Sequence, residues 1–474
     1  MKRKALVFLD YDMLIRHFIL SGVFHELEQR YEVVYVFHQD QTSEKQGIYA
    51  DIEKLGLKNW TRFAVPRVRM GSWDKLYSIT ALNAQRGTPN FKPRKEIMAV
   101  VRGKWRTNYY HFLSLPGLFP LVQARLQRQM GVYEPLLDFV RDQNPDVIIH
   151  PSLLAGYFIN ELLIISRRRS IPLVIMMNSW DNPSTKAMNT GHPDRLIVWG
   201  PQSKQHAIQY LGMSPESIEE FGAAQFQLYR DPLKESEAAL RKEFHVLNNL
   251  PVLLYGGGCK GVNESAHLKM IDEKIDSGEI SPCHVLYRPH PWRGGLAPGE
   301  QSFFDMRLRH VTMDPHLEDY YCRTADAHCA GFDLADYQVT KRLLSLVSGV
   351  ISPLSTILLE SIIFGKPVLV YFSKTDQCSL ASTVYGIGIR LAHFKDFWGE
   401  PGIEVCNDDA QLPAACNRLL VNSQDESIRT GLRAHAEKFV VMNGPTYGER
   451  LVTLVDQLTH RRAPAAAKQE SVAS

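Results

Sequence analysis

The sequence lacks several features that would assign it to a class at once. Its 474 residues contain no uncharged apolar run of about 18 residues or more, so no transmembrane span is predicted. Asp10 and Asp12 interrupt the apolar N-terminal stretch, which is therefore not expected to be a signal peptide. No short internal repeat is visible. The net charge of +3 is too small to indicate nucleic-acid binding by itself.

Cysteine is scarce and scattered. All seven cysteines lie in the second half of the chain, at positions 259, 283, 322, 329, 378, 406 and 416, and none forms a CxxC pair. This pattern argues against a disulfide framework and against a zinc site, and it favours free thiols in a reducing cytoplasm. We therefore expect a cytoplasmic protein without a metal centre.

The sequence does contain short apolar runs that alternate with longer amphipathic segments, which is typical of βαβ units around a parallel sheet. Buried strands are predicted at residues 5–10, 32–38, 146–151, 172–179 and 195–200, and in a second series at 251–258, 284–291, 346–353 and 366–373. A chain of this length is expected to form more than one hydrophobic core. The pattern predicts an α/β protein with two doubly wound, Rossmann-like domains.

The boundaries of these domains follow from composition. We expect an N-terminal domain over residues 1–235 and a C-terminal domain over residues 246–445, joined by the charged stretch DPLKESEAALRKEF. A helix is predicted over residues 446–462. The tail 463–474 is small and polar, and we expect it to be disordered.

Polar loops follow the first two predicted strands of the second domain, at the edge where parallel sheets bind ligands. The first loop is GGGCKG, with Gly257, Gly258 and Lys260, and its glycines let the backbone approach a ligand closely. Its spacing matches neither GxGxxG nor a Walker A loop, and a tight turn explains it equally well. The second loop is RPHP, in which prolines stiffen the backbone around Arg288 and His290.

A third polar loop, SPLST, leads into the helical stretch TILLESIIFG. Ser355 and Thr356 lie near the start of this helix, where N-capping alone explains one of the two hydroxyls. Glu360 on the same helix either faces solvent or hydrogen-bonds a sugar. Together, the three loops offer groups that hold a phosphate or diphosphate, namely His290, Arg288 and the two hydroxyls.

These motifs resemble a known family. The stretch STILLESIIFGKPVLVY is similar to the second-domain signature of GT-B glycosyltransferases. RPHP together with SPLST resembles the His-Pro and Ser/Thr motifs of bacterial sialyl- and polysialyltransferases, capsule Kdo transferases and CDP-glycerol glycerophosphotransferases. The resemblance implies a GT-B fold, in which two Rossmann-like domains face a central cleft.

The resemblance also implies roles for individual residues. His290 and the pair Ser355 and Thr356 are expected to contact the donor phosphates, and Glu360 the donor ribose. Many retaining enzymes of this fold carry a further glutamate upstream, where this sequence has Ser352 and Pro353. This difference favours an inverting mechanism. The expected donor is a nucleotide-activated sugar, with no cofactor and no metal.

An inverting transfer needs a general base, which the first domain should supply. The loop NSWDNPSTKAMN follows a predicted strand directly and makes Asp181 the first candidate, with Trp180 as a stacking platform for a sugar. The segment Asp181–Asn182–Pro183 is also typical of a turn, which would explain these residues without a catalytic role. Asp10 and Asp12, just after the first strand, are the competing bases. His150 is expected to serve the acceptor site or packing.

The region 91–130 is rich in basic and aromatic residues. It contains one acid, Glu96, and eight bases: Lys92, Arg94, Lys95, Arg102, Lys104, Arg106, Arg125 and Arg128. Interleaved with them are Trp105, Tyr109, Tyr110, Phe112 and Phe119. This composition suits an anionic membrane surface or a phosphorylated lipid-linked acceptor. RNA binding and a solvated basic face over ordinary core residues remain open alternatives.

The sequence therefore predicts a GT-B glycosyltransferase that moves a sugar from a nucleotide-activated donor to a glycan or lipid-linked acceptor, in bacterial surface polysaccharide or capsule synthesis. We expect it in the cytoplasm or at the inner face of the membrane, and we do not expect a nucleic-acid partner. The alternatives are a CDP-glycerol-type polyol-phosphate transferase, a sugar-nucleotide epimerase and a non-catalytic carbohydrate- or RNA-binding protein.

Overall fold

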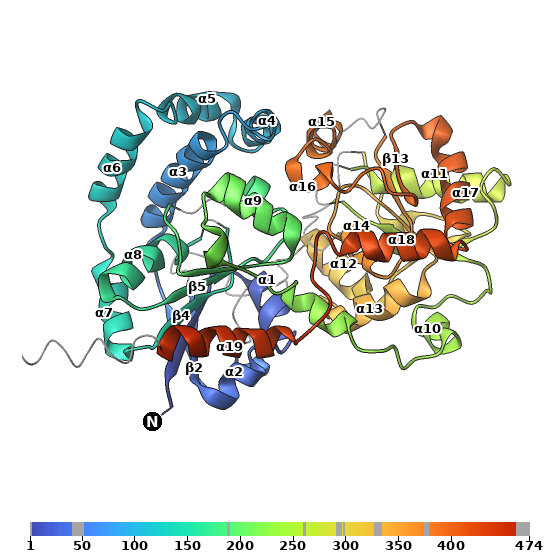
Figure 1. Cartoon of the computed structure of the whole chain (residues 1–474). Coiled ribbons are helices and arrows are strands. Elements are labelled where there is room, and N and C mark those ends of the chain that lie inside the picture. The colour runs from blue at the N-terminus through green and yellow to red at the C-terminus, as the bar shows by residue number, and fades with distance from the viewer. Residues whose placement is uncertain are drawn as a thin grey trace, which may run out of the picture. The chain divides into compact units, whose positions relative to one another are not determined.

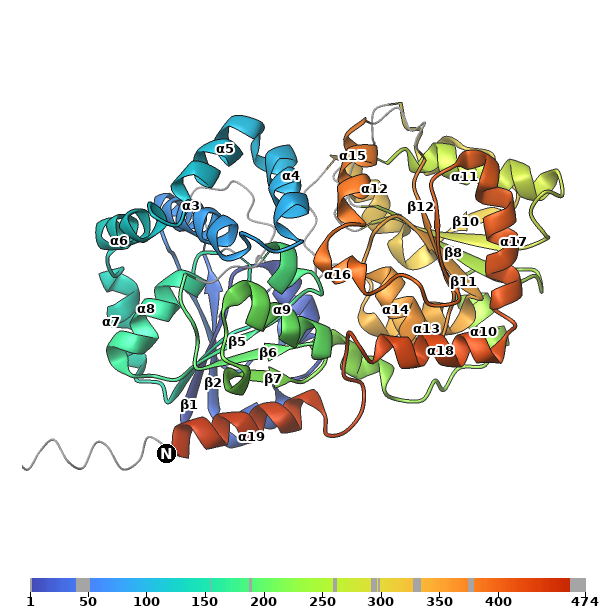
Figure 2. The ribbon, with the colours of Figure 1, turned by 45° about the horizontal axis from the view of Figure 1, so that its top comes forward.

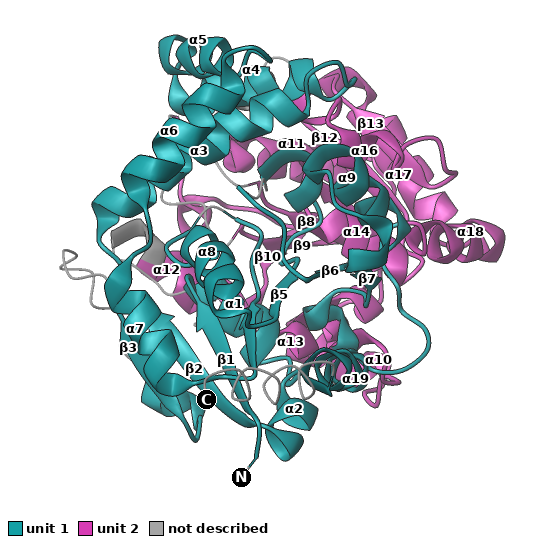
Figure 3. Cartoon of the chain, turned by 60° about the vertical axis from the view of Figure 1, so that its left-hand side comes forward, with its two compact units in different colours: residues 1–227, 439–474 teal, residues 228–438 magenta. Residues whose placement is uncertain are grey.

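The computed structural model describes residues 2–39, 52–154, 156–186, 190–258, 262–290, 296, 299–326, 334–373 and 379–460. The chain divides into two compact units, unit 1 with residues 1–227 and 439–474, and unit 2 with residues 228–438 (Figure 3). The ranges expected from composition, 1–235 and 246–445, differ from these units because the chain returns to unit 1 at Phe439. The tail 463–474 lies outside the described residues.

Unit 1 is built on a seven-stranded sheet in which every neighbouring pair is parallel. The strand order is β3-β2-β1-β4-β5-β6-β7. The strands are β1 (Lys4–Leu9), β2 (Glu32–His38), β3 (Trp60–Phe63), β4 (Val147–His150), β5 (Leu173–Met176), β6 (Arg195–Val198) and β7 (Ile218–Glu220). The central strands β1, β4 and β5 are almost entirely buried, as expected for a parallel sheet covered on both faces.

The helical segments of unit 1 include a long insertion between β3 and β4. In this insertion α5 and α6 pack on α3, and α4 packs on α5, at a distance from the sheet (Figures 1 and 2). The segments are α1 (Asp12–Leu14), η1 (Ile15–Ile19), α2 (His25–Arg30), η2 (Ile52–Leu55), α3 (Arg67–Ala84), α4 (Phe91–Arg102), α5 (Lys104–Leu113), α6 (Phe119–Met130), α7 (Glu134–Gln143), α8 (Ile159–Arg169), η3 (Asn182–Lys186), α9 (Pro201–Leu211), η4 (Pro215–Ser217) and α19 (Tyr447–His460). The segment η5 (Ala224–Tyr229) begins in unit 1 and ends in unit 2.

Unit 2 is built on a six-stranded parallel sheet with the order β10-β9-β8-β11-β12-β13. Its strands are β8 (Val252–Gly256), β9 (His284–Arg288), β10 (Val311–Met313), β11 (Gly349–Ser352), β12 (Val368–Tyr371) and β13 (Ile403–Cys406). Alternate residues of these strands, such as Leu253 and Tyr255, pack with α11 and α17 in one core. The predicted pair of parallel α/β domains is therefore confirmed.

The helical segments of unit 2 follow its strands in the expected alternation. They are α10 (Glu237–Glu243), α11 (Glu264–Asp276), η6 (Phe303–Asp305), η7 (Pro315–Leu317), α12 (Glu318–Asp326), α13 (Tyr337–Leu346), α14 (Ile357–Ile363), α15 (Ser379–Gly388), α16 (Ala392–Lys395), η9 (Asp409–Gln411), α17 (Leu412–Asn422) and α18 (Glu426–Ala436). Gly365 follows α14 with a φ of 66°, a conformation that glycine adopts without strain. The helix α14 thus lies within the stretch TILLESIIFG that was expected to be helical.

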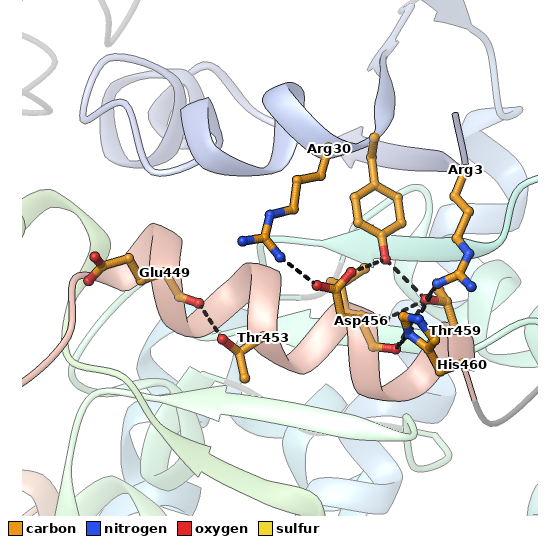
Figure 4. A network of polar contacts seen from close by, with 9 residues as sticks. Arg3, Arg30, Glu449, Thr453, Asp456, Thr459 and His460 are labelled. Atoms are coloured by element: carbon orange, nitrogen blue, oxygen red, sulfur yellow. Dashed lines mark hydrogen bonds and ion pairs between the residues drawn. The ribbon is translucent and has the colours of Figure 1, made fainter. Parts of the chain in front are cut away.

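The helix α19 belongs to unit 1 although it follows all of unit 2 in the chain. It packs against α2 and β4, and it buries Leu451, Val452 and Val455. Figure 4 shows polar contacts along this helix, including an ion pair between Arg30 and Asp456, whose charged atoms lie 2.9 Å apart. Among the helices that the structure describes, none has both the length and the apolar character of a membrane span.

Candidate functional site

Three loops at the carboxyl edge of the unit 2 sheet pack directly against one another. β8 lies between β9 and β11, so the glycine loop 256–258 lies between RPHP and SPLST. A Cβ atom on Gly257 would lie 2.8 Å from the backbone nitrogen of His290, and one on Gly258 would lie 3.1 Å from Cγ of Pro353. A larger residue does not fit at either position. The glycines therefore allow the three strand ends to meet.

Glu264 fixes this glycine loop, and sequence reasoning missed it. Its side chain is buried, with the residue only 1% exposed. Oε1 accepts a hydrogen bond from the backbone N–H of Gly258 (2.6 Å), and Oε2 accepts one from the hydroxyl of Tyr287 (2.5 Å). A buried carboxylate needs such donors to offset the loss of water. The only sequence signal was an acid directly after the loop, in the first turn of a helix.

The N-terminus of α11, which follows the glycine loop, is already occupied by protein acceptors. Oε1 of Glu300 accepts from the backbone N–H groups of Glu264 (3.0 Å) and Ser265 (3.3 Å). Oδ1 of Asn263 accepts from the N–H of Ala266 (3.1 Å). Helix N-termini attract anions, and here a carboxylate of the chain takes that place. The N–H groups of Glu264, Ser265 and Ala266 therefore already have acceptors within the chain.

The SPLST loop offers hydroxyl groups beside the glycine loop. Ser355 and Thr356 are both partly exposed. Thr356 is the residue that precedes α14, and within the described part of the chain its hydroxyl makes no capping hydrogen bond. Capping therefore does not explain Thr356 in this structure.

Glu360 lies on α14 and is mostly buried. The Tyr229 hydroxyl donates a hydrogen bond to its Oε2. This contact orients the carboxylate within unit 2, and the residue is not a freely solvated surface acid. The predicted contact between Glu360 and a donor ribose stays a prediction.

Arg288 has partners inside unit 2, and its predicted contact with a phosphate stays a prediction. Its guanidinium is mostly buried, lies 3.4 Å from the carboxylate of Asp314 and donates a hydrogen bond to Oγ1 of Thr340 (3.0 Å). Asp314 follows β10, the neighbour of β9, and its side chain is fully buried. A buried carboxylate without a counter-charge is strongly destabilising. Arg288 therefore serves as the partner of Asp314 inside unit 2.

His290 and Lys260 are the remaining residues predicted for the donor side. His290 is partly exposed, and its backbone packs against Gly257. Its role as a phosphate contact stays a prediction. Lys260 lies outside the described residues.

In unit 1, two residues that were predicted separately form one buried pair. Asp10 follows β1, and His150 ends the neighbouring strand β4. Nε2 of His150 lies 2.7 Å from Oδ2 of Asp10, and both side chains are fully buried. Oδ1 of Asp10 also accepts from the backbone N–H groups of Tyr157 (2.9 Å) and Phe158 (3.1 Å). The pair joins the strand ends to the start of α8.

The contacts of this pair fix the orientation of the imidazole ring. Nδ1 of His150 lies 2.8 Å from the carbonyl oxygen of Ser152, and Nε2 faces Oδ2 of Asp10. The other carboxyl oxygen of Asp10 accepts from the two backbone N–H groups. Both oxygens of Asp10 therefore have partners inside unit 1, and the residue is not an exposed base.

Asp181 is partly exposed, unlike Asp10. Its Oδ2 lies 2.8 Å from Nζ of Lys186, and its Oδ1 accepts from the hydroxyl of Ser179 (2.8 Å). Its side chain retains 16% exposure, whereas that of Asp10 has none. Asp12 is partly exposed at the start of α1, and its Oδ1 accepts from the N–H of Met13 (2.8 Å).

The loop that carries Asp181 is anchored by the helical insertion. The carbonyl oxygen of Ser184 accepts from Nε2 of Gln85 (3.0 Å), Nδ2 of Asn90 (2.6 Å) and Nη1 of Arg94 (3.0 Å). Burial lowers the pKa of Arg94 to about 10. Arg94, counted above among the basic residues of 91–130, is therefore an interior anchor and not part of a basic surface.

Trp180 is not the sugar platform that was predicted. The residue is 2% exposed, its Nε1 donates to Oε1 of Gln202 (2.8 Å), and its ring packs edge-on against Phe439 at 5.5 Å. The indole is therefore taken up by protein packing. The aromatic residue next to Asp181 stabilises the contact between α9 and the returning chain.

Comparison with known proteins gives matches among solved structures alone. No protein-family model and no curated protein sequence matches the chain. A Listeria monocytogenes protein described as a UDP-N-acetylglucosamine 2-epimerase superposes with a TM-score of 0.55 at 10% identity, over 98% of this chain and 97% of its own. UDP-GlcNAc 2-epimerase from Neisseria meningitidis gives 0.51 at 10% identity, over 96% and 100%. The wall teichoic acid polymerase TagF gives 0.50 at 10% identity, over 97% and 90%.

These similarities concern the fold. Each spans nearly the whole of this chain, so they include both parallel sheets. Together with the two α/β units they identify the GT-B fold, and the resemblance drawn from the sequence is confirmed at that level. At 10% identity they do not transfer a reaction or a substrate.

Proposed function

We propose that this protein is a glycosyltransferase that transfers a sugar from a nucleotide-activated donor to a glycan or lipid-linked acceptor in bacterial surface polysaccharide synthesis. The observation that carries the proposal is the packing of three polar loops at one edge of the unit 2 sheet, where Gly257 meets His290 and Gly258 meets Pro353. The carboxyl edge of a parallel sheet is where this kind of fold binds its ligands.

In this proposal unit 2 binds the diphosphate of the donor. The ring N–H of His290 and the hydroxyls of Ser355 and Thr356 donate to phosphate oxygens, and Glu360 accepts from the ribose. Two features support this choice. The N–H groups at the start of α11 are used by Asn263 and Glu300, and Thr356 is not engaged in capping.

Unit 1 provides the acceptor side, with Asp181 as the base. Asp181 takes the proton of the acceptor hydroxyl, whose oxygen forms a bond to the anomeric carbon. The bond between that carbon and the donor phosphate breaks, and the nucleotide leaves with both electrons. Neutral donors and the His290 ring stabilise the departing phosphate, so transfer is expected to continue when divalent cations are chelated.

The donor site is tested by thermal unfolding in the presence of CMP, CDP, UDP, GDP or ADP. A nucleotide at about 100 times its dissociation constant stabilises the folded state by about 3 kcal/mol, which raises the midpoint of a unit of roughly 200 residues by about 5–10 °C. CMP alone would indicate a sialic- or Kdo-type donor, and CDP would indicate a polyol-phosphate donor. His290→Ala should abolish the shift.

His316→Ala is the matched control, because His316 is a partly exposed histidine of unit 2 whose partner is Glu243. It should keep the full nucleotide shift. A shift that survives His290→Ala would place the phosphate elsewhere. If none of the five nucleotides raises the unfolding midpoint, the proposed donor site is wrong.

The reaction is tested by NMR on the matching nucleotide sugar with candidate acceptors. Release of free nucleotide with a new glycosidic signal supports transfer, and Asp181→Asn should lose this release while it keeps the nucleotide shift. A sugar that changes configuration while it stays attached to the nucleotide would instead identify an epimerase and overturn the proposal.

A further inference from the structure

Helices α4 to α6 expose large apolar side chains that a solvated protein surface normally keeps apart. Those with high exposure in this region are Val101, Trp105, Tyr109, Phe112, Leu115 and Leu121. Trp105 is the most exposed of them, at 89%. Contiguous exposed apolar surface usually marks a site of interaction with a partner or a membrane.

On α5 the exposed residues form a single stripe. Trp105, Tyr109 and Phe112 are spaced by four and three residues, so they fall within an arc of about 60° on the helix. Thr107 and Tyr110 lie on the opposite side and are buried, and Tyr110 belongs to the core cluster that includes Ile79 and Met98. The apolar stripe is therefore not the packing face of the helix, because α5 has a separate one.

Basic residues flank this stripe. Lys104 and Arg106 adjoin Trp105 on its two sides, and both are exposed. Nζ of Lys75 lies 5.6 Å from the centre of the Tyr109 ring. On α6, Arg125 and Arg128 are also exposed. Glu96 is the one acid in residues 91–130, so this part of the surface carries a positive charge.

Two bases of 91–130 are bound by other residues of the protein. Arg94 is buried and donates to Ser184, and Arg102 forms a bidentate ion pair with Asp74. The bases of 91–130 that are exposed are Lys92, Lys104, Arg106, Arg125 and Arg128. The region is therefore an amphipathic surface of aromatic and aliphatic groups with a cationic border.

We propose that this surface binds an anionic lipid bilayer, with α5 lying in the headgroup region. Trp105, Tyr109 and Phe112 would enter the boundary between headgroups and acyl chains, and Lys104, Arg125 and Arg128 would contact lipid phosphates. Tryptophan and tyrosine favour this boundary because their rings are apolar and carry one polar group. The bases add attraction to an anionic leaflet.

The exposed aliphatic side chains favour a bilayer over RNA. Val101 on α4, Leu115 between α5 and α6, and Leu121 on α6 are further exposed aliphatic residues of this region. Aliphatic groups gain from contact with acyl chains, whereas single-stranded nucleic acid is held mainly by stacking on rings and by charge. This inference does not depend on the proposed reaction, because no residue of the donor or base assignment lies in α4 to α6.

The test is flotation of the full chain with vesicles of phosphatidylcholine alone and with about 30% phosphatidylglycerol. Binding is expected to the anionic vesicles, and to fall at least tenfold for the triple variant W105S/Y109S/F112S or for K104E/R125E/R128E. All six side chains are exposed, so both variants should keep the far-UV circular dichroism of the wild type. Leu247→Ser, at a residue of unit 2 that is 97% exposed, is the control and should bind fully.

A second readout places Trp105 in the membrane. Lipids brominated on the acyl chain should quench part of the tryptophan fluorescence of the wild type and less of that of Trp105→Phe. Equal quenching of the two proteins would overturn the proposal. Binding of both triple variants to the anionic vesicles at the level of the wild type would also overturn it. The same holds if the wild type does not bind vesicles and the variants instead lose oligonucleotide binding or self-association.

Discussion

Replacing Arg288 by methionine should destabilise unit 2 strongly, whatever it does to ligand binding. The guanidinium lies 3.4 Å from the carboxylate of Asp314, whose side chain has no solvent exposure. Removal of one partner from a buried ion pair costs about 3–5 kcal/mol, because the other charge stays buried and uncompensated. For a unit of about 200 residues this corresponds to a fall of roughly 6–20 °C in its unfolding midpoint.

The double variant R288M/D314N separates a structural role from a role in phosphate binding. The amide introduced at position 314 would have no charge to compensate, and its oxygen could still accept from the N–H of His316, as Asp314 does at 3.1 Å. We expect the double variant to recover most of the lost stability and to keep the nucleotide-induced shift. Urea unfolding followed by fluorescence gives the free energies of the four proteins in this cycle.

Two outcomes would refute this reasoning. A loss below about 1 kcal/mol in the single variant would mean that Asp314 does not depend on Arg288. A double variant that is stable but shows no nucleotide-induced shift would indicate that Arg288 binds the donor phosphate.

Two further predictions concern other residues. Gly258→Ala should lower the free energy of unfolding by about 1–3 kcal/mol and weaken nucleotide binding, because the added methyl group would clash with the Tyr385 hydroxyl. Gly386→Ala is the control and should be tolerated, since no atom lies within 4 Å of the added carbon. Burial lowers the pKa of His17 from 6.5 to about 3. The unfolded chain therefore binds a proton below pH 6.5 that the folded chain does not, and unit 1 should lose about 2 kcal/mol between pH 7 and pH 5. His17→Gln should reduce this loss in acid denaturation curves, and an unchanged slope would contradict the assignment.

The sequence predicted the interior of both sheets and missed their borders. Every strand predicted from an apolar run is present, from β1 to β12. The four strands without a prediction, β3, β7, β10 and β13, are the edge strands of the two sheets. An edge strand has one neighbour and keeps part of its surface in solvent, so it does not need a continuous apolar run. Its sequence therefore resembles that of a loop.

The candidate site shows a similar division. The positions of the three polar loops followed from the order of the strands, because the ends of parallel strands meet at one edge. The partners of the side chains did not follow, since Arg288 and Asp314, or Asp10 and His150, are brought together by neighbouring strands and not by sequence spacing. Glu264 and the burial of Trp180 depend in the same way on packing that composition does not encode.

The return of α19 to unit 1 has a consequence for the order of folding. Residues 228–438 form a continuous segment and can complete their sheet as soon as they have been synthesised. Unit 1 cannot be completed until α19 has been synthesised, because residues near its N-terminus bind this helix. Tyr31 donates a hydrogen bond of 2.7 Å to Asp456, and Arg3 donates one of 2.9 Å to Thr459. The part of the chain made first is therefore completed last, and during synthesis its surface under α19 stays open to water or to chaperones.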